Sequence, residues 1–252
     1  MGKTLQYKLW IGILCSITLS VGAAKKVKVY LVGDSTMSQK EVSAYPETGW
    51  GMPFAYFFDS TVVIDNRAQN GRSSRTFLEE NRWKAILDSV QAGDYVFIQF
   101  GHNDEVQTKK SYTPEAQFQV NLIKYVTEAR AKKALPILIT PVSRRNFDST
   151  GTLKSSHDAY SAVVRSVAKA QAVPCIDLDL ESQDLYRKMG PEHSRLLFNQ
   201  LLAEEHPNYP EGKMDNTHFN ELGARKIAEI VLRNIKLLKL DLAHRIVKPK
   251  VK

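Results

Sequence analysis

The chain has 252 residues, of which 43% are hydrophobic and 25% are charged, and its formal net charge is +8 at pH 7. The composition is that of a globular protein, and the length suits one well-packed domain and is short for two. A basic protein favours anionic partners, such as an acidic polysaccharide, a membrane surface or a nucleic acid. The sequence contains no nucleic-acid-binding motif, which argues against the last of these.

Residues 1–24 have the organisation of a secretory signal peptide. Lys3 and Lys8 precede an uncharged apolar run at 9–23, which ends in small residues. This run of about 15 residues is shorter than the ~20 that a membrane-spanning helix needs, although a retained anchor stays the alternative. We therefore predict export to the periplasm or the extracellular space, a single mature domain at 25–252, and no stable membrane insertion after cleavage.

Export would leave the mature chain with one cysteine. Removal of the signal peptide takes away Cys15, and it lowers the formal net charge from +8 to +6. A single Cys175 excludes an intramolecular disulfide and a metal site made of paired thiolates. Because Cys175 lies in an apolar run, we expect it to be a buried small hydrophobic residue.

Strand and helix patterns alternate along the rest of the chain. Short apolar runs predict strands at 27–32, 62–64, 95–100, 136–140 and 173–178. Amphipathic patterns predict helices at 52–58, 75–90 with a break near Asn81, 114–133, 155–172, 181–203 and 221–239. We expect Thr113 and Asn220 to cap two of these helices, and residues 204–217 to be irregular. The alternation predicts an α/β fold with a parallel sheet that is covered on both faces.

Four polar clusters follow predicted strands or precede the last helix. They are DS at 34–35, NGRSS at 70–74, GHND at 101–104 and DNTH at 215–218. Each cluster alone fits a turn or a helix cap better than a catalytic role. Because open α/β sheets bind ligands at the carboxyl ends of their strands, we expect the four clusters to meet there.

Together the clusters supply the groups that acyl transfer requires. Ser35 provides a hydroxyl nucleophile, His218 a base that titrates near neutral pH, and Asp215 a carboxylate that can hold the other imidazole nitrogen. Gly71 offers an unobstructed backbone N–H, and Asn103 offers a side-chain amide, to a developing oxyanion.

The clusters resemble, in this order, the four sequence blocks of the SGNH (GDSL-type) hydrolases. Within that superfamily the chain is most similar to the rhamnogalacturonan acetylesterases. The resemblance extends from residue 27 to about 239 and rests on GDSTM at 33–37, NRA at 66–68, GRSSR at 71–75, QFGHND at 99–104 and DNTH at 215–218. Thr36 replaces the leucine of the GDSL string, which weakens a lipase interpretation.

The resemblance implies a three-layer α/β/α sandwich of the flavodoxin-like type, with five parallel strands and no cofactor or metal. It implies Ser35 as the nucleophile and His218 with Asp215 as its base and orienting acid. It also implies an oxyanion hole made by the N–H groups of Ser35 and Gly71 and the side chain of Asn103.

Arg72 and Arg75 follow the predicted strand at 62–64, and Arg144 and Arg145 follow the one at 136–140. These four arginines suggest a negatively charged substrate. Bidentate guanidinium groups suit the carboxylates of galacturonate in acetylated pectin. The alternative is that these groups are solvated or form ion pairs with Asp104 or Glu79. Trp50 could stack on a sugar ring, or it could belong to the core. The predicted substrate-binding residues are therefore Arg72, Arg75, Arg144, Arg145 and Trp50.

We therefore predict an exported serine esterase that removes O-acetyl groups from an acidic plant cell-wall polysaccharide, with rhamnogalacturonan as the first candidate. A second possibility is an acyl esterase for acetylated xylan, peptidoglycan or lipid. A carbohydrate-binding protein without turnover, or a redox flavoprotein, would share the fold, since fold does not determine function. The sequence does not indicate the oligomeric state.

Overall fold

The computed structural model describes residue 2 and residues 26–248. The predicted signal peptide and its cleavage site therefore lie outside the described residues, apart from Gly2. Among the described helices, none combines the length and the apolar character needed to cross a bilayer.

A five-stranded parallel sheet forms the centre of the molecule, in the order β2-β1-β3-β4-β5. Its strands are β1 (Val27–Gly33), β2 (Val62–Asn66), β3 (Tyr95–Gln99), β4 (Leu135–Ile139) and β5 (Cys175–Ile176). These segments are rich in apolar and β-branched residues, as expected for strands that are buried on both faces. The predicted α/β class and the five parallel strands are confirmed.

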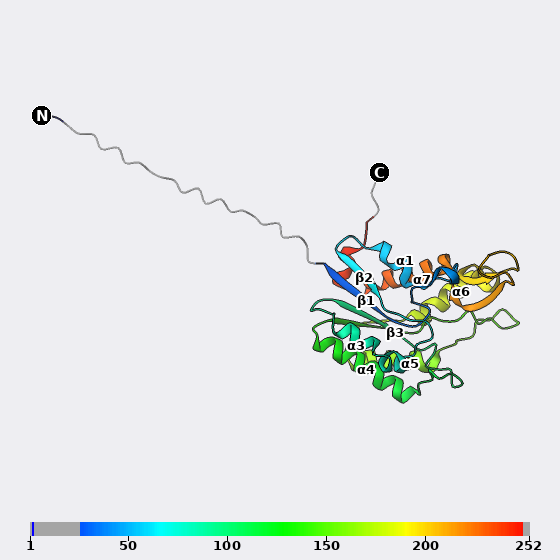
Figure 1. The fold of residues 1–252 in the computed structure, drawn as a ribbon, viewed down its shortest axis with the longest axis horizontal. Coiled ribbons are helices and arrows are strands. Elements are labelled where there is room, and N and C mark those ends of the chain that lie inside the picture. Colours follow the sequence, from blue (N-terminus) through cyan, green and yellow to red (C-terminus); the bar gives the residue numbers. More distant parts are fainter. Residues whose placement is uncertain (1, 3–25, 249–252) are drawn as a thin grey trace.

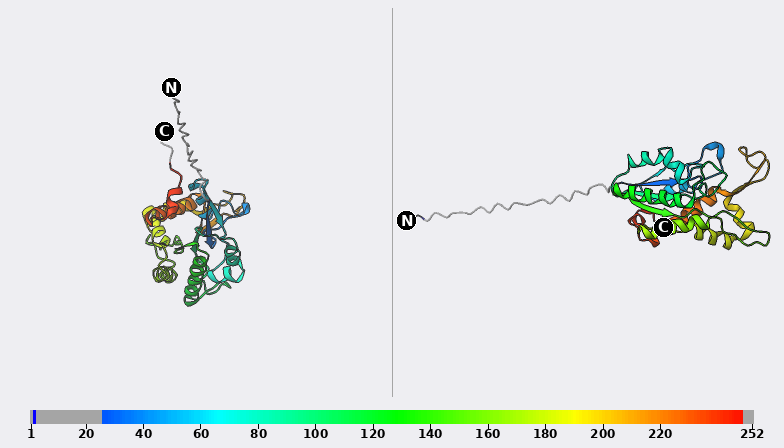
Figure 2. Two further views of the ribbon diagram at one scale, coloured as in Figure 1. Left: turned by 90° about the vertical axis from the view of Figure 1, so that its left-hand side faces the viewer. Right: turned by 90° about the horizontal axis from the view of Figure 1, so that it is seen from below.

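Helices cover both faces of this sheet, which gives three layers (Figures 1 and 2). Successive side chains of β1 alternate between two cores: Val29 and Leu31 face one, and Tyr30 and Val32 face the other. The first core is closed by α1 (Gly51–Phe54), α6 (Leu178–His193) and α7 (Glu221–Leu237). The second is closed by α2 (Ser74–Glu79), α3 (Arg82–Leu87), α4 (Glu115–Ala131) and α5 (Asp158–Ala170).

The residues at the helix ends confirm two of the predicted boundaries and contradict one predicted cap. Asn81 has φ of 56° and separates α2 from α3, which confirms the predicted break. Asn220 accepts a hydrogen bond from the Gly223 N–H and caps α7, as predicted. The predicted cap at Thr113 is wrong, because its hydroxyl contacts Ser73 and a carbonyl instead, and Pro114 occupies the cap position of α4.

The segment after β5 differs most from the prediction. Asp177 caps α6, so β5 ends earlier and the helix begins earlier than expected. The helix ends at His193, soon after Gly190 with φ of 73°, and a 3₁₀ turn leads into β6 (Phe198–Leu201). The prediction of helical segments across 181–203 is therefore wrong from Phe198 on. Cys175 is only half-buried, and burial still raises the pKa of its thiol to about 11.

An antiparallel hairpin lies where the sequence predicts the end of the helical segments and an irregular stretch at 204–217. β6 pairs with β7 (Lys213–Phe219), and the two strands form a sheet separate from the main one. The residues of β7 are mostly polar and show no alternation of apolar side chains, so the sequence pattern predicts no strand there. Figure 1 shows this hairpin on the right, at the end of the sheet away from the start of β1.

Candidate active site

A tight turn after β1 presents Ser35. A side chain at Gly33 would place its Cβ 2.6 Å from the carbonyl oxygen of Gln99, so only glycine fits where the two strands end together. The carboxylate of Asp34 accepts hydrogen bonds from the Thr36 N–H at 3.0 Å and the Thr36 hydroxyl at 2.8 Å. This closed turn fixes the backbone on both sides of Ser35.

A buried line of hydrogen bonds supports the turn from below. The Gln99 side-chain amide donates to the Thr36 hydroxyl at 2.6 Å, and its oxygen accepts from the Trp50 indole N–H at 2.8 Å. Trp50 is completely buried, so its ring has no face free for a sugar. The prediction that Trp50 binds substrate is wrong, and Trp50 instead holds Gln99 in place.

Ser35, His218 and Asp215 form a continuous chain of hydrogen bonds. The Ser35 hydroxyl lies 2.9 Å from Nε2 of His218, and Nδ1 of His218 lies 2.8 Å from Oδ2 of Asp215. The other carboxylate oxygen of Asp215 accepts from the backbone N–H groups of Thr217 and His218, at 2.7 and 2.9 Å. The chain thus has the geometry of a nucleophile, a base and an orienting acid.

The electrostatics of Asp215 determine which imidazole nitrogen carries the proton. Burial acts to raise the pKa of Asp215, but the hydrogen bonds from His218 and from the Thr217 N–H outweigh it and lower the pKa to about 2. The carboxylate is therefore ionised at neutral pH and accepts the Nδ1 proton of His218. The lone pair of Nε2 is then directed at the Ser35 hydroxyl.

The predicted oxyanion donors lie in the loops that follow β1, β2 and β3. Gly71 has φ of 76°, a conformation that suits glycine, and it is exposed. Within residues 26–248, the N–H groups of Ser35 and Gly71 have no hydrogen-bond partner. The Asn103 amide donates one hydrogen bond, to the Arg72 carbonyl at 3.1 Å, which leaves its second N–H for a ligand.

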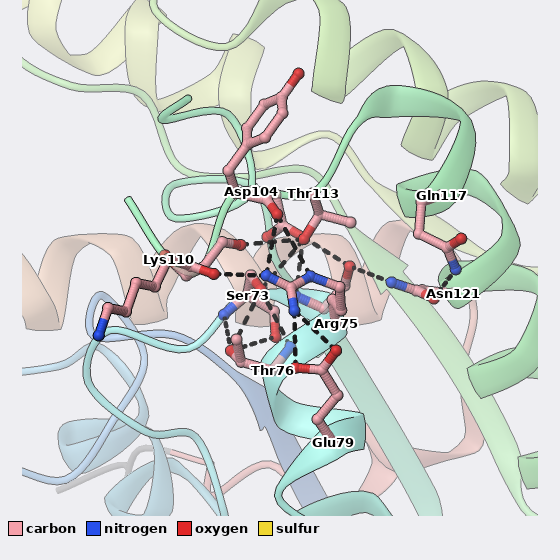
Figure 3. A network of polar contacts seen from close by, with 12 residues as sticks. Ser73, Arg75, Thr76, Glu79, Asp104, Lys110, Thr113, Gln117 and Asn121 are labelled. Carbon is pink, nitrogen blue, oxygen red and sulfur yellow. Dashed lines mark hydrogen bonds and ion pairs between the residues drawn. The ribbon is translucent and has the colours of Figure 1, made fainter. Parts of the chain in front are cut away.

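Asp104 joins two of these loops. One of its carboxylate oxygens accepts from the Ser74 N–H at 2.9 Å and the Ser74 hydroxyl at 2.6 Å, at the start of α2. The other accepts from the Gly101 N–H at 3.1 Å. Figure 3 shows Asp104 in a network of polar contacts that also contains Ser73 and Thr113. The loop of Asn103 is thereby fixed to the loop of Gly71.

We expect Asp104→Asn to lower the free energy of unfolding by about 3 kcal/mol. Donors occupy both carboxylate oxygens, so an amide NH₂ at either position would face an N–H group across a buried contact. Urea denaturation measures the change. The control is Asp88→Asn, at the exposed carboxyl-terminal cap of α3 beside Lys84, for which we expect a change within about 0.5 kcal/mol. Equal effects of the two substitutions would contradict this role of Asp104.

Arg72 and Arg75 are held by groups of the protein. Arg72 forms an ion pair with Glu80 at 3.0 Å and donates to the Asn70 carbonyl at 2.8 Å. Arg75 pairs with Glu79 at 2.7 Å and donates to the carbonyl oxygens of Lys110 and Tyr112. Figure 3 shows Arg75 between Glu79 and Lys110. The alternative of an ion pair with Glu79 is therefore realised for Arg75.

Arg144 and Arg145 are held in the same way. Arg144 donates to the Thr217 hydroxyl at 2.6 Å. Arg145 donates to the Asn216 side chain at 2.9 Å, to the Ser194 hydroxyl at 3.0 Å and to the Pro191 carbonyl. Each of the four predicted arginines thus has partners within the protein.

A buried pair of histidines beside Asn103 was not assigned a role from the sequence. Nδ1 of His102 lies 3.2 Å from Nε2 of His157, and Nδ1 of His157 lies 2.8 Å from a carboxylate oxygen of Glu105. Burial lowers the pKa of His102 well below its usual value, and His157 and Arg144 lower it further. His102 stands in the GHND cluster, which was a usable signal. His157 precedes a helix and belongs to no sequence motif, so the sequence contains no signal for its role.

The chain matches a known protein family and is similar to curated proteins. Residues 31–226 match the model of the GDSL-like lipase/acylhydrolase family. The chain is 40% identical over 223 residues to the rhamnogalacturonan acetylesterase RhgT of Bacillus subtilis (strain 168), which covers 88% of the chain and 95% of that protein. It is 28% identical over 243 residues to the rhamnogalacturonan acetylesterase of Emericella nidulans, with 88% and 89% covered.

Solved structures share the fold. Protein YXIM from Bacillus subtilis superposes with a TM-score of 0.74 at 27% identity, over 86% of this chain and 58% of that one. The acetylxylan esterase Axe2 from Geobacillus stearothermophilus superposes with a TM-score of 0.59 at 16% identity, over 84% and 94%. At 16% identity, the similarity to Axe2 shows a shared fold and nothing more.

Proposed function

The chain belongs to the GDSL-like lipase/acylhydrolase family and is a carboxylic ester hydrolase, and we propose that it removes O-acetyl groups from rhamnogalacturonan after export from the cytoplasm. The observation that supports a serine mechanism is the unbroken chain from Ser35 through His218 to Asp215, at 2.9 and 2.8 Å. Ser35 is the proposed nucleophile, His218 the general base and Asp215 the residue that orients it.

In the proposed first half-reaction, the Ser35 hydroxyl attacks the acetyl carbonyl while Nε2 of His218 accepts its proton. The carbonyl oxygen becomes an oxyanion, which receives hydrogen bonds from the N–H groups of Ser35 and Gly71 and from the Asn103 amide. Asp215 stabilises the imidazolium that forms. The tetrahedral intermediate then expels the sugar hydroxyl, which takes its proton from His218, and an acetyl-serine remains.

The second half-reaction releases acetate. A water molecule occupies the position that the sugar oxygen has left, and His218 removes its proton as it attacks the acetyl-serine. The same three donors stabilise the second oxyanion. Collapse returns the proton to Ser35 and restores the starting state, so the cycle uses only groups of this chain and water.

Two observations support an acidic polysaccharide as the substrate. Two of the curated relatives described above are named as rhamnogalacturonan acetylesterases, and one of them is 40% identical over most of both chains. The chain would also keep a net charge of +6 after loss of residues 1–24, which favours an anionic polymer. Arg72 is the proposed substrate contact, because it adjoins Gly71 and its side chain is about one-third exposed.

We expect salt to separate the polymer from a small ester. Raising the ionic strength to about 0.5 M shortens the Debye length to a few ångströms, so attraction between a basic surface and galacturonate weakens. The KM for acetylated rhamnogalacturonan should rise severalfold, whereas hydrolysis of p-nitrophenyl acetate should barely change. Acetate release measures the first rate and absorbance the second. Equal salt responses, or faster turnover of acetylated xylan, would contradict the pectin assignment and leave the esterase assignment intact.

A further inference from the structure

Arg144 and Arg145 hold the two residues that separate the proposed acid from the proposed base. Arg144 donates to the Thr217 hydroxyl at 2.6 Å. The Arg145 backbone N–H donates to the Asn216 carbonyl at 2.9 Å, and its guanidinium donates to the Asn216 side chain, also at 2.9 Å. The loop after β4 is thus attached to β7 by backbone and side-chain contacts, immediately beside His218.

Arg144 also reaches the loop that carries Asn103. Its second terminal nitrogen lies 3.4 Å from the His102 carbonyl and 3.4 Å from a carboxylate oxygen of Glu105. The other oxygen of Glu105 accepts from the buried His157, which contacts His102 in turn. One guanidinium therefore connects the segment of the base to the loop of an oxyanion donor.

The position of β7 explains why such a connection is needed. In the described part of the chain, β7 pairs with β6 and with no strand of the main sheet. Ser35 and Asn103, in contrast, follow strands at the centre of that sheet. The distance between His218 and the other reacting groups therefore depends on contacts that cross from the sheet to the hairpin.

We propose that Arg144 is a positioning residue, which holds Asn216–Thr217 against the Asn103 loop and so sets where His218 stands relative to Ser35. Its guanidinium already donates to Thr217, His102 and Glu105. A substrate carboxylate would have to displace those contacts. This inference rests on the proposed function, because it assumes that His218 is the base. It assigns to Arg144 a role different from the substrate binding that the sequence suggested.

The test uses a small neutral ester, which has no carboxylate for an arginine to bind. We expect Arg144→Ala to lower kcat for p-nitrophenyl acetate by about 10- to 100-fold with KM changed less than threefold, because a small displacement of a base is costly. Thr217→Val removes the acceptor while keeping the side-chain shape, and it should lower kcat to a similar extent. The double variant should be little worse than either single one, because both remove the same contact.

Two further variants distinguish a positioning role of Arg144 from an effect of its positive charge and from a general effect on protein stability. Arg144→Lys keeps the positive charge beside Glu105 but offers one nitrogen for three partners, so we expect an intermediate kcat. Arg130→Ala is the matched control: its guanidinium also joins two segments, through the carbonyl oxygens of Gln171 and Ala172, but it lies away from the site. Its kcat should equal that of the wild type.

The outcomes distinguish this proposal from its alternatives. Wild-type kcat for p-nitrophenyl acetate in Arg144→Ala and Thr217→Val, with a raised KM for acetylated rhamnogalacturonan in Arg144→Ala alone, would overturn it in favour of substrate binding. Strictly additive losses would also overturn it, because they would mean that the two residues act separately. A failure of the serine mechanism would appear elsewhere, as retained activity in Ser35→Ala.

Discussion

Ser35→Ala is expected to reduce kcat for ester hydrolysis by at least about 10⁴-fold, with the fold unchanged. No other hydroxyl lies within hydrogen-bond distance of Nε2 of His218 among the described residues, so nothing can replace the attacking oxygen. Among the described residues the Ser35 hydroxyl bonds only to His218, so its loss removes one hydrogen bond at a loop. Acetate release and circular dichroism measure the two expectations.

Ser60→Ala is the matched control for this substitution. Ser60 is exposed and precedes β2, at the edge of the sheet opposite Ser35, so we expect wild-type activity. Activity of Ser35→Ala within tenfold of the wild type would contradict the assignment of the nucleophile. Loss of the circular dichroism signal would show instead that Ser35 is needed for folding.

Asp215→Asn is expected to lower kcat by about 10⁴-fold and to leave KM near its wild-type value. Three N–H groups donate to the carboxylate, two of them from the backbone of Thr217 and His218. An amide has one oxygen, which the two backbone N–H groups would occupy. Its NH₂ group would then face Nδ1 of His218 and place the imidazole proton on Nε2, toward Ser35, where a base is required.

Asp184→Asn is the corresponding control. Asp184 lies on the exposed side of α6 and pairs with Arg187, and we expect its replacement to leave kcat unchanged. Initial rates of p-nitrophenyl acetate hydrolysis over a range of concentrations separate kcat from KM. A loss smaller than about tenfold in Asp215→Asn would show that another group orients His218.

The sequence was sufficient to predict the main sheet and the meeting of the polar clusters. Strands such as β1 and β3 are short and apolar and are bounded by glycine or polar residues, and this local pattern is specific. Because the carboxyl ends of parallel strands share one edge, the clusters that follow them had to lie together. The structure accordingly brings Asn103, after β3, next to Arg72, after β2. His218 reaches Ser35 from β7, which lies outside the main sheet, so this rule does not account for its position.

The hairpin and the contacts of the arginines could not be predicted in this way. β7 is polar along its length and is held by β6 and by the arginines after β4, so no local periodicity marks it. An arginine in a loop has the same sequence signal whether it meets a substrate or another loop. Trp50 illustrates the same limit, since only the position of Gln99 reveals that its indole N–H has a buried partner.

The most direct test of the account is covalent labelling with a fluorophosphonate, which reacts with serines that a neighbouring base activates. The account predicts that inactivation of the wild type accompanies one phosphonyl group per chain, located by peptide mass spectrometry on Ser35. Ser35→Ala should take up no label. Inactivation with an unmodified Ser35, or a label on a different serine that persists in Ser35→Ala, would contradict the proposed serine mechanism.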